Sequence, residues 1–291
     1  MWVGYAFASA LFAGLTAILA KVGVQHTDSN LATAIRTTVV LAAAWVMVLV
    51  VGSASQLGTL DASTIGFLVA SGLATGGSWL CYFKALQLGE VNKVAPIDRL
   101  SIVLTVVLAM VFLGETDHLT TRLPGIALIG IGTWLMVHRR ATEPHTDAGP
   151  APGGRWLPYA LGAAVFAALT AILGKIGISG VESNLGTAIR TTVVLVLAWG
   201  IVLASGARTH RPAVPRRDLT YILLSGLATG ASWLCYFKAL QDGPASVVVP
   251  IDKLSIVVTV ALAAWLLGER LTSRGWAGLG LIVAGTLLML L

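Results

Sequence analysis

Long apolar stretches alternate with short polar segments along the whole chain. Each stretch is about 20 residues long, enough for an α-helix to span the hydrocarbon core of a bilayer, and none shows the period-two alternation of a barrel strand. Because lipid offers no partner to exposed backbone groups, each stretch is predicted to be helical. The predicted helices cover residues 2–24, 29–52, 63–88, 92–114, 119–137, 156–178, 183–206, 219–242, 246–268 and 274–291.

The chain contains an internal repeat, in which the pattern of polar and apolar positions recurs at a constant offset of 154 residues. SNLATAIRTTVVL at 29–41 returns as SNLGTAIRTTVVL at 183–195, and PIDRLSIVLTV at 96–106 returns as PIDKLSIVVTV at 250–260. Each copy holds five predicted helices, an odd number, so the second copy is expected to be inverted in the membrane. The predicted fold is an all-α membrane protein of ten transmembrane helices in two inverted five-helix repeats. The predicted bounds are 1–138 for the first repeat, 139–155 for a Pro- and Gly-rich linker, and 156–291 for the second repeat.

Composition agrees with the membrane class. The chain is 56% hydrophobic and 11% charged, with a mean hydropathy of +0.86, whereas soluble domains are about 25% charged. A pI near 9.6 is typical of nucleic-acid binding, but basic loops on one membrane face explain it better, so no nucleic-acid partner is predicted. All five histidines fall in loops or at helix ends, and no catalytic triad, metal spacing or phosphate-binding loop occurs. The sequence therefore predicts neither an enzyme nor a bound cofactor or metal.

The basic loop residues predict the orientation. Loops on the side opposite the N-terminus carry ten of them, against Arg122 alone on the N-terminal side. The basic side is expected to be cytoplasmic, which leaves both termini outside the cytoplasm. The ten are Lys93, Arg139, Arg140, Arg155, Arg208, Arg211, Arg216, Arg217, Arg270 and Arg274.

Ten further charged residues lie inside the predicted helices, and each has a twin in the other copy. Snorkelling to the headgroups is the alternative for Lys21, Lys84 and their twins. It is weaker for Arg36 and Arg190, which lie about 9 Å from their helix starts at 1.5 Å per residue. Inversion places the two sets in opposite halves of the bilayer, so one set violates the positive-inside preference. We favour a functional polar cavity over purely structural ion pairs, with the bases as candidate substrate-binding residues. The two sets are Lys21, Arg36, Lys84, Asp98 and Arg99, and Lys175, Arg190, Lys238, Asp252 and Lys253.

The two intramembrane carboxylates are candidates for proton or charge coupling. Asp98 and Asp252 each follow a proline by two residues, Pro96 and Pro250. A proline removes a helix hydrogen bond and so predicts a local break beside each carboxylate. The simpler alternative is that Asp98 neutralises a neighbouring base.

Repeated aromatic and small residues have two readings each. Trp79 and Tyr82, with their twins Trp233 and Tyr236, are either cavity walls and substrate contacts or interfacial belt residues. G-x-x-x-G pairs inside the helices 63–88 and 219–242 permit close helix contact, and internal packing is favoured over dimerisation, which favours a monomer.

The five-helix unit, with K-x-G near the end of its first helix and L-G-E at the end of its fourth, resembles the EamA family of the drug/metabolite transporter superfamily. The resemblance covers both copies, through runs such as PID[RK]LS and SWLCYFKALQ. It implies small-metabolite carriers, often exporters, of the prokaryotic inner membrane, with a central cavity that opens alternately to each side. Related multidrug proteins carry a glutamate in the first helix for cations, and this chain has Lys21 and Lys175 at the ends of the corresponding helices, which argues against a cation pump.

Three functions follow as hypotheses. The leading one is a secondary-active transporter, an exporter, of a small anionic or zwitterionic metabolite by alternating access, with protons as a candidate coupling ion. The second is a flippase for a phosphate-bearing lipid, and the third is a non-transporting membrane scaffold. The implied partners are the lipid bilayer and a small-molecule substrate.

Overall fold

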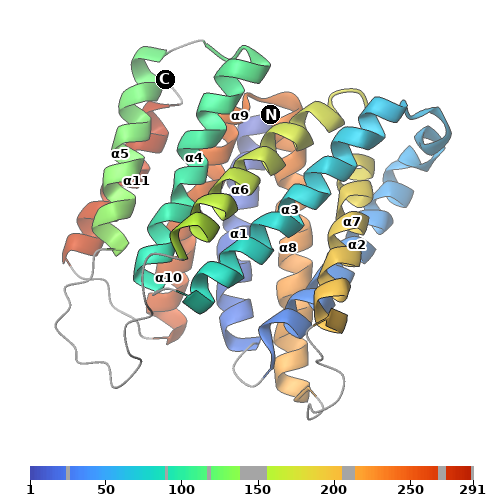
Figure 1. Ribbon diagram of the computed structural model, residues 1–291, viewed down its shortest axis with the longest axis horizontal. Helices are drawn as coiled ribbons and strands as arrows, with labels where there is room; N and C mark the ends of the chain where they lie inside the picture. The colour runs from blue at the N-terminus through green and yellow to red at the C-terminus, as the bar shows by residue number, and fades with distance from the viewer. Residues whose placement is uncertain are drawn as a thin grey trace. The chain divides into compact units, whose positions relative to one another are not determined.

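The computed structural model contains helices and no strands in the residues it describes, which are 1–23, 27–88, 91–116, 119–137, 156–204, 214–267 and 273–289. Figure 1 shows the helices in chain order. They are α1 (Trp2–Gly23), α2 (Ser29–Val51), the short 3₁₀ helix η1 (Ser53–Thr59), α3 (Ala62–Leu88), α4 (Val91–Leu113), α5 (Leu119–Val137), α6 (Trp156–Ile178), α7 (Ser183–Ala204), α8 (Arg216–Asp242), α9 (Ala245–Lys253), α10 (Ser255–Leu267) and α11 (Ser273–Leu288).

The predicted helices coincide with observed ones to within three residues, except for the ninth. The predicted helix 246–268 is two helices, α9 and α10, separated at Leu254. There the amide of Leu254 bonds the carbonyl of Ile251, and the amide of Val257 bonds the carbonyl of Leu254, both in the tighter i→i+3 pattern. Such 3₁₀ turns inside a helix are common at hinges. The break follows Pro250 and Asp252, where a break was predicted, whereas α4 is continuous through Pro96.

Seven segments of the described chain are long and apolar enough to cross a membrane. They start at Trp2, Asn30, Ala62, Trp156, Ser183, Arg216 and Ala245, and the last of them joins α9 and α10. Many of their large apolar side chains are exposed, as Val50, Val196 and Trp265 are, which suits a surface that faces lipid. Membrane crossing by α4, α5 and α11 stays a prediction.

Two acidic residues at equivalent positions begin corresponding helices of the two copies. The carboxylate of Asp28 accepts hydrogen bonds from the amides of Asn30 and Leu31, at 2.9 and 3.1 Å. The carboxylate of Glu182 accepts from the amides of Asn184 and Leu185, at 3.0 and 3.1 Å. Both satisfy first-turn amides and complement the helix dipole. The motif of the repeat therefore includes its own helix start signal.

The chain forms two compact units, and each takes segments from both sequence copies. The first unit comprises residues 1–76 and 170–269, and the second comprises 77–169 and 270–291. Helices α3 and α6 contribute to both units. Helices of one sequence copy therefore pack with helices of the other copy inside each unit.

Within the first unit, α1 and α8 lie side by side and run antiparallel (Figure 1). Gly23 at the end of α1 lies against Ile222 near the start of α8, and Trp2 lies against Gly243 just past its end. Since the first and third helices of one copy are predicted to cross in the same direction, this antiparallel packing is what an inverted second copy requires.

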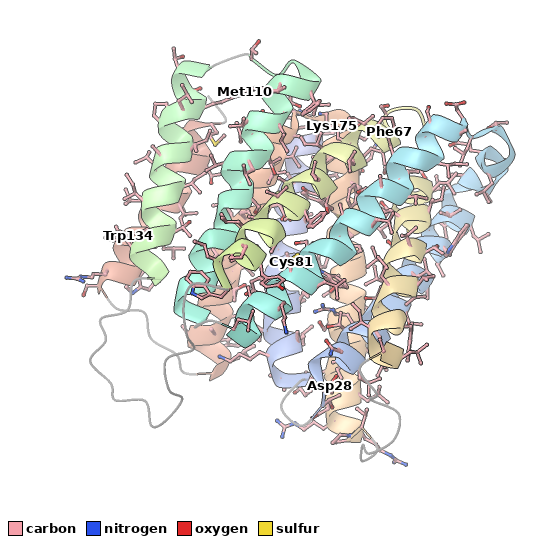
Figure 2. All side chains as sticks on the ribbon, in the orientation of Figure 1. Asp28, Phe67, Cys81, Met110, Trp134 and Lys175 are labelled. Carbon is pink, nitrogen blue, oxygen red and sulfur yellow. The ribbon has the colours of Figure 1, made fainter. Side chains whose placement is uncertain are left out.

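The lysines near the end of the first helix of each copy, Lys21 and Lys175, lie at opposite ends of the first unit. The ammonium of Lys175 donates a hydrogen bond to the carbonyl of Gly243, next to Trp2 at the start of α1. Lys21 is in the last turn of the same helix, about 28 Å away at 1.5 Å per residue. Figure 2 shows Lys175 and Asp28 toward opposite ends of the helices, and Asp28 precedes α2 just after α1 ends.

Glycine pairs set the close helix contacts. In the first unit, a Cβ on Gly72 would lie 2.8 Å from the carbonyl oxygen of Arg190, and one on Gly226 would lie 2.7 Å from Val39. The G-x-x-x-G motifs therefore pack inside the molecule, as predicted. In the second unit, α5 packs against α11 so closely that a Cβ on Gly132 would lie 2.5 Å from the Gly278 carbonyl oxygen. A cluster of Ile102, Val106, Ile129 and Met289 forms the buried core there.

Candidate functional site

Arg190 is the most deeply buried charged residue that the structure describes, with 1% of its side chain exposed. It lies on α7 and points at α3 and α8. Its Nη2 donates to the hydroxyl of Thr75 at 2.8 Å, and its Nε donates to the hydroxyl of Ser71 at 3.4 Å. The guanidinium carbon lies 4.1 Å from the ring centre of Phe237 and 5.0 Å from that of Trp233. This arrangement is a slot with hydroxyls on one wall and aromatic faces on the other.

One nitrogen of this guanidinium has no hydrogen-bond partner. Arg190 Nη1 is buried and has no hydrogen-bond partner. A buried unsatisfied donor costs about 1–3 kcal/mol, and more when charged. No carboxylate pairs with Arg190 in the described residues. The slot therefore leaves one buried N–H group of a charged side chain without an acceptor.

Asp252 forms a second polar cluster beside α8. The Ser9 hydroxyl donates to the Asp252 carboxylate at 2.6 Å, and it lies 3.2 Å from the Ser232 hydroxyl. Ser232 also donates to the carbonyl of Ser9 at 3.1 Å. Tyr236, one turn along α8, lies within electrostatic reach of both Asp252 and Arg190. The predicted residues Trp233, Tyr236, Arg190 and Asp252 are thus gathered around one stretch of α8.

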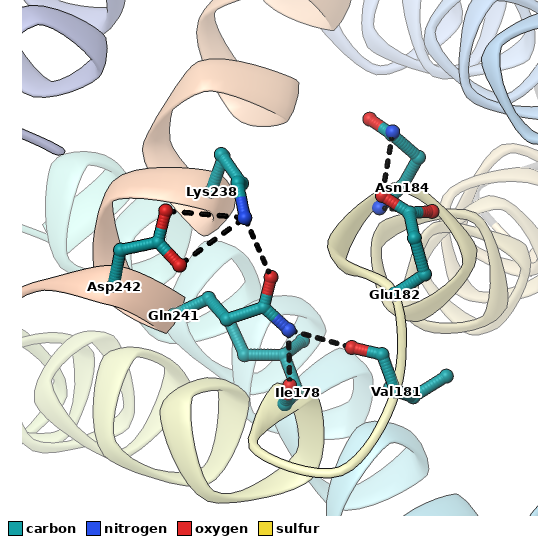
Figure 3. A network of polar contacts seen from close by, with 7 residues as sticks. All are labelled: Ile178, Val181, Glu182, Asn184, Lys238, Gln241 and Asp242. Atoms are coloured by element: carbon teal, nitrogen blue, oxygen red, sulfur yellow. Dashed lines mark hydrogen bonds and ion pairs between the residues drawn. The ribbon is translucent and has the colours of Figure 1, made fainter. Parts of the chain in front are cut away.

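Lys238 occupies a different environment at the end of α8. It pairs with Asp242 at 3.1 Å and donates to the side-chain carbonyl of Gln241 at 3.2 Å. The Gln241 amide in turn donates to the carbonyls of Ile178 and Val181, at 2.7 and 2.6 Å (Figure 3). This network ties α8 to the loop between α6 and α7. A substrate contact by Lys238 stays a prediction.

The network borders a cavity of about 760 Å³ at the same end of the first unit. Two carboxylates, Asp61 and Glu182, line it. Hydrogen bonds from the Ser63 side chain and amide lower the pKa of the exposed Asp61 carboxyl, so it stays ionised at neutral pH. The remaining lining residues are Gln56, Thr59, Leu60, Thr64, Ser179, Gly180, Val181 and Gln241.

The other predicted site residues are spread over both units. In the first unit Lys21 is exposed, Arg36, Lys175 and Lys253 are half-buried, and Pro250 is buried within α9. In the second unit Trp79 and Tyr82 are half-buried and Lys84 is exposed, and Tyr82 packs against a cluster of Ala85 and Ala160. Pro96, Asp98 and Arg99 belong to α4, but their side chains lie outside the described residues.

Sequence reasoning missed the small hydroxyl residues that hold the charges. Ser71 and Thr75 bind Arg190, Ser9 binds Asp252, and Ser232 binds Ser9. The available signal was the repeat itself, because Ser71 and Thr75 recur as Ser225 and Thr229 with the one-turn spacing that puts both on one helix face.

Comparisons with known proteins agree with this architecture. The sequence profile of the EamA-like transporter family matches residues 1–138 and again 154–291. An uncharacterized transporter in the cobO 3' region of Sinorhizobium sp is 46% identical over 134 residues, which is 46% of this chain and 95% of that protein. That relative is therefore about one repeat long.

Two further likenesses are more distant. The probable 4-amino-4-deoxy-L-arabinose-phosphoundecaprenol flippase subunit ArnE of Pectobacterium atrosepticum is 32% identical over 80 residues, or 27% of this chain and 71% of that protein. One crystal structure superposes with a TM-score of 0.79 over 99% of this chain and 96% of the other, at 16% identity, which supports the fold alone. The profile match over both copies shows that this chain is an integral membrane protein of the EamA-like transporter family, within the drug/metabolite transporter superfamily.

Proposed function

We propose that the protein is a secondary-active exporter of a small anionic or zwitterionic metabolite and works by alternating access. The observation that carries this proposal is Arg190, a fully buried guanidinium with one unbonded nitrogen and only neutral partners among the described residues. A charge at mid-membrane costs at least about 2.5–3.5 kcal/mol. A structural role alone does not offset that cost, whereas binding a carboxylate or phosphate oxygen does.

The inverted packing supports alternating access. Equivalent bases, Lys21 and Lys175, lie at opposite ends of the first unit. A carrier of this kind presents one chemical design to both aqueous compartments in turn. We infer that the arginine-rich side faces the cytoplasm and that both termini lie outside it.

Transport assays with reconstituted vesicles test the proposal. Vesicles holding the purified protein are offered labelled amino acids, organic acids and phosphorylated compounds, with and without a pH gradient. We expect uptake of one anionic or zwitterionic class above protein-free vesicles, because the bases attract its negative group. The matched control combines Arg36→Ala with Arg190→Ala, and uptake that survives this double change would rule out the anion role.

Asp252 is proposed to couple transport to protons. Its carboxylate accepts a short bond from Ser9 next to the break between α9 and α10, so a change in its charge acts on a hinge. We expect Asp252→Asn to abolish the stimulation of uptake by a pH gradient while exchange of substrate across the membrane, without a gradient, continues. The control is Asp242→Asn, whose carboxylate belongs to the Lys238 pair. Gradient-driven uptake that is unchanged in Asp252→Asn would contradict the coupling role.

A flippase for a phosphate-bearing lipid is the second candidate, and the likeness to the ArnE flippase subunit favours it. The same guanidinium would hold a lipid phosphate. Vesicles with a fluorescent phospholipid in both leaflets separate the two candidates, because a flippase makes inner-leaflet lipid accessible to a quencher and a metabolite exporter does not. The scaffold hypothesis requires fully salt-bridged polar residues, and the bonding of Arg190 to hydroxyls speaks against it.

A further inference from the structure

The two copies build the same set of hydroxyl contacts at equivalent positions of the first unit. Ser71 donates to the carbonyl of Thr170 at 2.8 Å, and the Thr75 hydroxyl lies 3.3 Å from that of Thr170. The twin of Thr170 is Thr16. Its carbonyl accepts from Ser225 at 3.4 Å, and its hydroxyl accepts from Thr229 at 3.3 Å. The hydroxyl pairs Ser71/Thr75 and Ser225/Thr229 are therefore two equivalent docking sites.

The arginines that belong to these docking sites differ. Arg190 is bonded to its site, with both Ser71 and Thr75, and is almost entirely buried. Arg36, its twin, is only half-buried. Arg36 forms no hydrogen bond or ion pair in the part of the chain that the structure describes. Ser225 and Thr229 bond Thr16 and leave Arg36 undocked. One sequence motif is thus found in two states within one molecule.

We propose that this asymmetry is one half of the transport cycle, in which Arg190 is docked and Arg36 is the guanidinium that binds the anionic group of the substrate. In the other half the roles exchange, so that Arg36 docks on Ser225 and Thr229 while Arg190 leaves its slot. This inference rests on the proposed function and assigns the anion site to one arginine at a time.

The chemistry favours such an exchange. A hydroxyl is a neutral acceptor, so docking holds a guanidinium more weakly than an anion does. Because the two docking sites have the same hydroxyl pair, the two states are close in free energy, and a small differential interaction shifts their populations. The backbone break between α9 and α10 lies beside α8, which carries the second docking site.

Arginine reactivity in the purified full-length protein tests the exchange without any substrate. Phenylglyoxal adds to guanidinium groups, and peptide mass spectrometry reports the modification rates of Arg36 and Arg190 separately. In the unaltered protein we expect Arg36 to react at least about tenfold faster than Arg190. Ser71→Ala with Thr75→Ala removes two bonds to a charged group, each worth about a tenfold factor or more. We expect Arg190 to react at least about tenfold faster in this variant and Arg36 to react correspondingly more slowly.

The exchange of the two arginines predicts that the modification rates of Arg36 and Arg190 change in opposite directions. Ser225→Ala with Thr229→Ala, which does not touch Arg190, should slow Arg190 further and keep Arg36 reactive. Ser78→Ala removes another buried hydroxyl of α3, bonded to the Ala163 carbonyl, and should change neither rate. If a double variant aggregates on size exclusion, Thr75→Val alone serves in its place. Rates that rise together, or a change confined to the mutated site, would overturn the exchange while leaving the transport proposal intact, since no substrate is present.

Discussion

Arg190→Met is expected to abolish transport and to leave the protein at least as stable as before. Methionine fills the slot between the aromatic rings and the α3 hydroxyls without a charge, and replacing a buried charge with an apolar side chain of similar size is often stabilising, by about 1–4 kcal/mol. Loss of the guanidinium should lower uptake about a hundredfold or more, the usual cost of removing one partner of a buried charged contact. Uptake in vesicles and thermal unfolding in detergent measure the two effects.

Arg190→Lys provides the matched control, because it keeps the charge but cannot bond Ser71 and Thr75 together or present a flat cation to Phe237. We expect it to retain a small part of the uptake and to unfold at a lower temperature than Arg190→Met. Strong destabilisation of the Arg190→Met variant would mean that Arg190 stabilises the folded protein. Normal transport by this variant would mean that Arg190 does not bind the anionic group of the substrate.

Gly132→Ala is expected to destabilise the second unit by about 1–3 kcal/mol, the usual cost of an overpacked core. A Cβ there would lie 2.5 Å from the carbonyl oxygen of Gly278 and 2.9 Å from the amide of Ile282. Both are backbone atoms of α11, so relief requires the two helices to move apart. Thermal unfolding in detergent reports the loss.

Gly130→Ala lies in the same helix and is the matched control. A Cβ at Gly130 meets nothing within 4 Å, and the gain in helix propensity makes alanine equal to or better than glycine there, by up to about 1 kcal/mol. Equal unfolding temperatures for the two variants would mean that the close contact between α5 and α11 contributes nothing to stability.

The helices were predictable to within a few residues because their limits are local properties of the chain. The apolar runs end at polar residues, and Asp28 and Glu182 bind the first amides of the helices that follow them. The break at Leu254 was harder to locate, since the equivalent segment through Pro96 continues as one helix. A proline that lowers helix stability does not by itself decide where, or whether, the helix divides.

The candidate site was predictable in its charges but not in its partners. Arg190, Trp233, Tyr236 and Asp252 stood out because charges inside apolar helices are costly and because each recurs at the fixed offset. Ser71 and Ser9 did not stand out, because a hydroxyl is common in apolar helices and has meaning only through the residue it faces. The partner of Lys238 was not predicted either, although Asp242 lies only one turn further along α8.

The amino-acid sequence alone determined that this protein is a duplication with an equivalent set of charges in each copy, and it predicted that the second copy is inverted. It could not distinguish Arg36 from Arg190, because the residues around them are nearly identical in the two copies. Only the tertiary structure decided that Arg190 is buried on Ser71 and Thr75 while Arg36 is undocked. The physical reason is that two nearly identical segments have the same local conformational preferences, so the sequence allows either arginine to bond the hydroxyl pair. Packing between the copies determines which arginine does so.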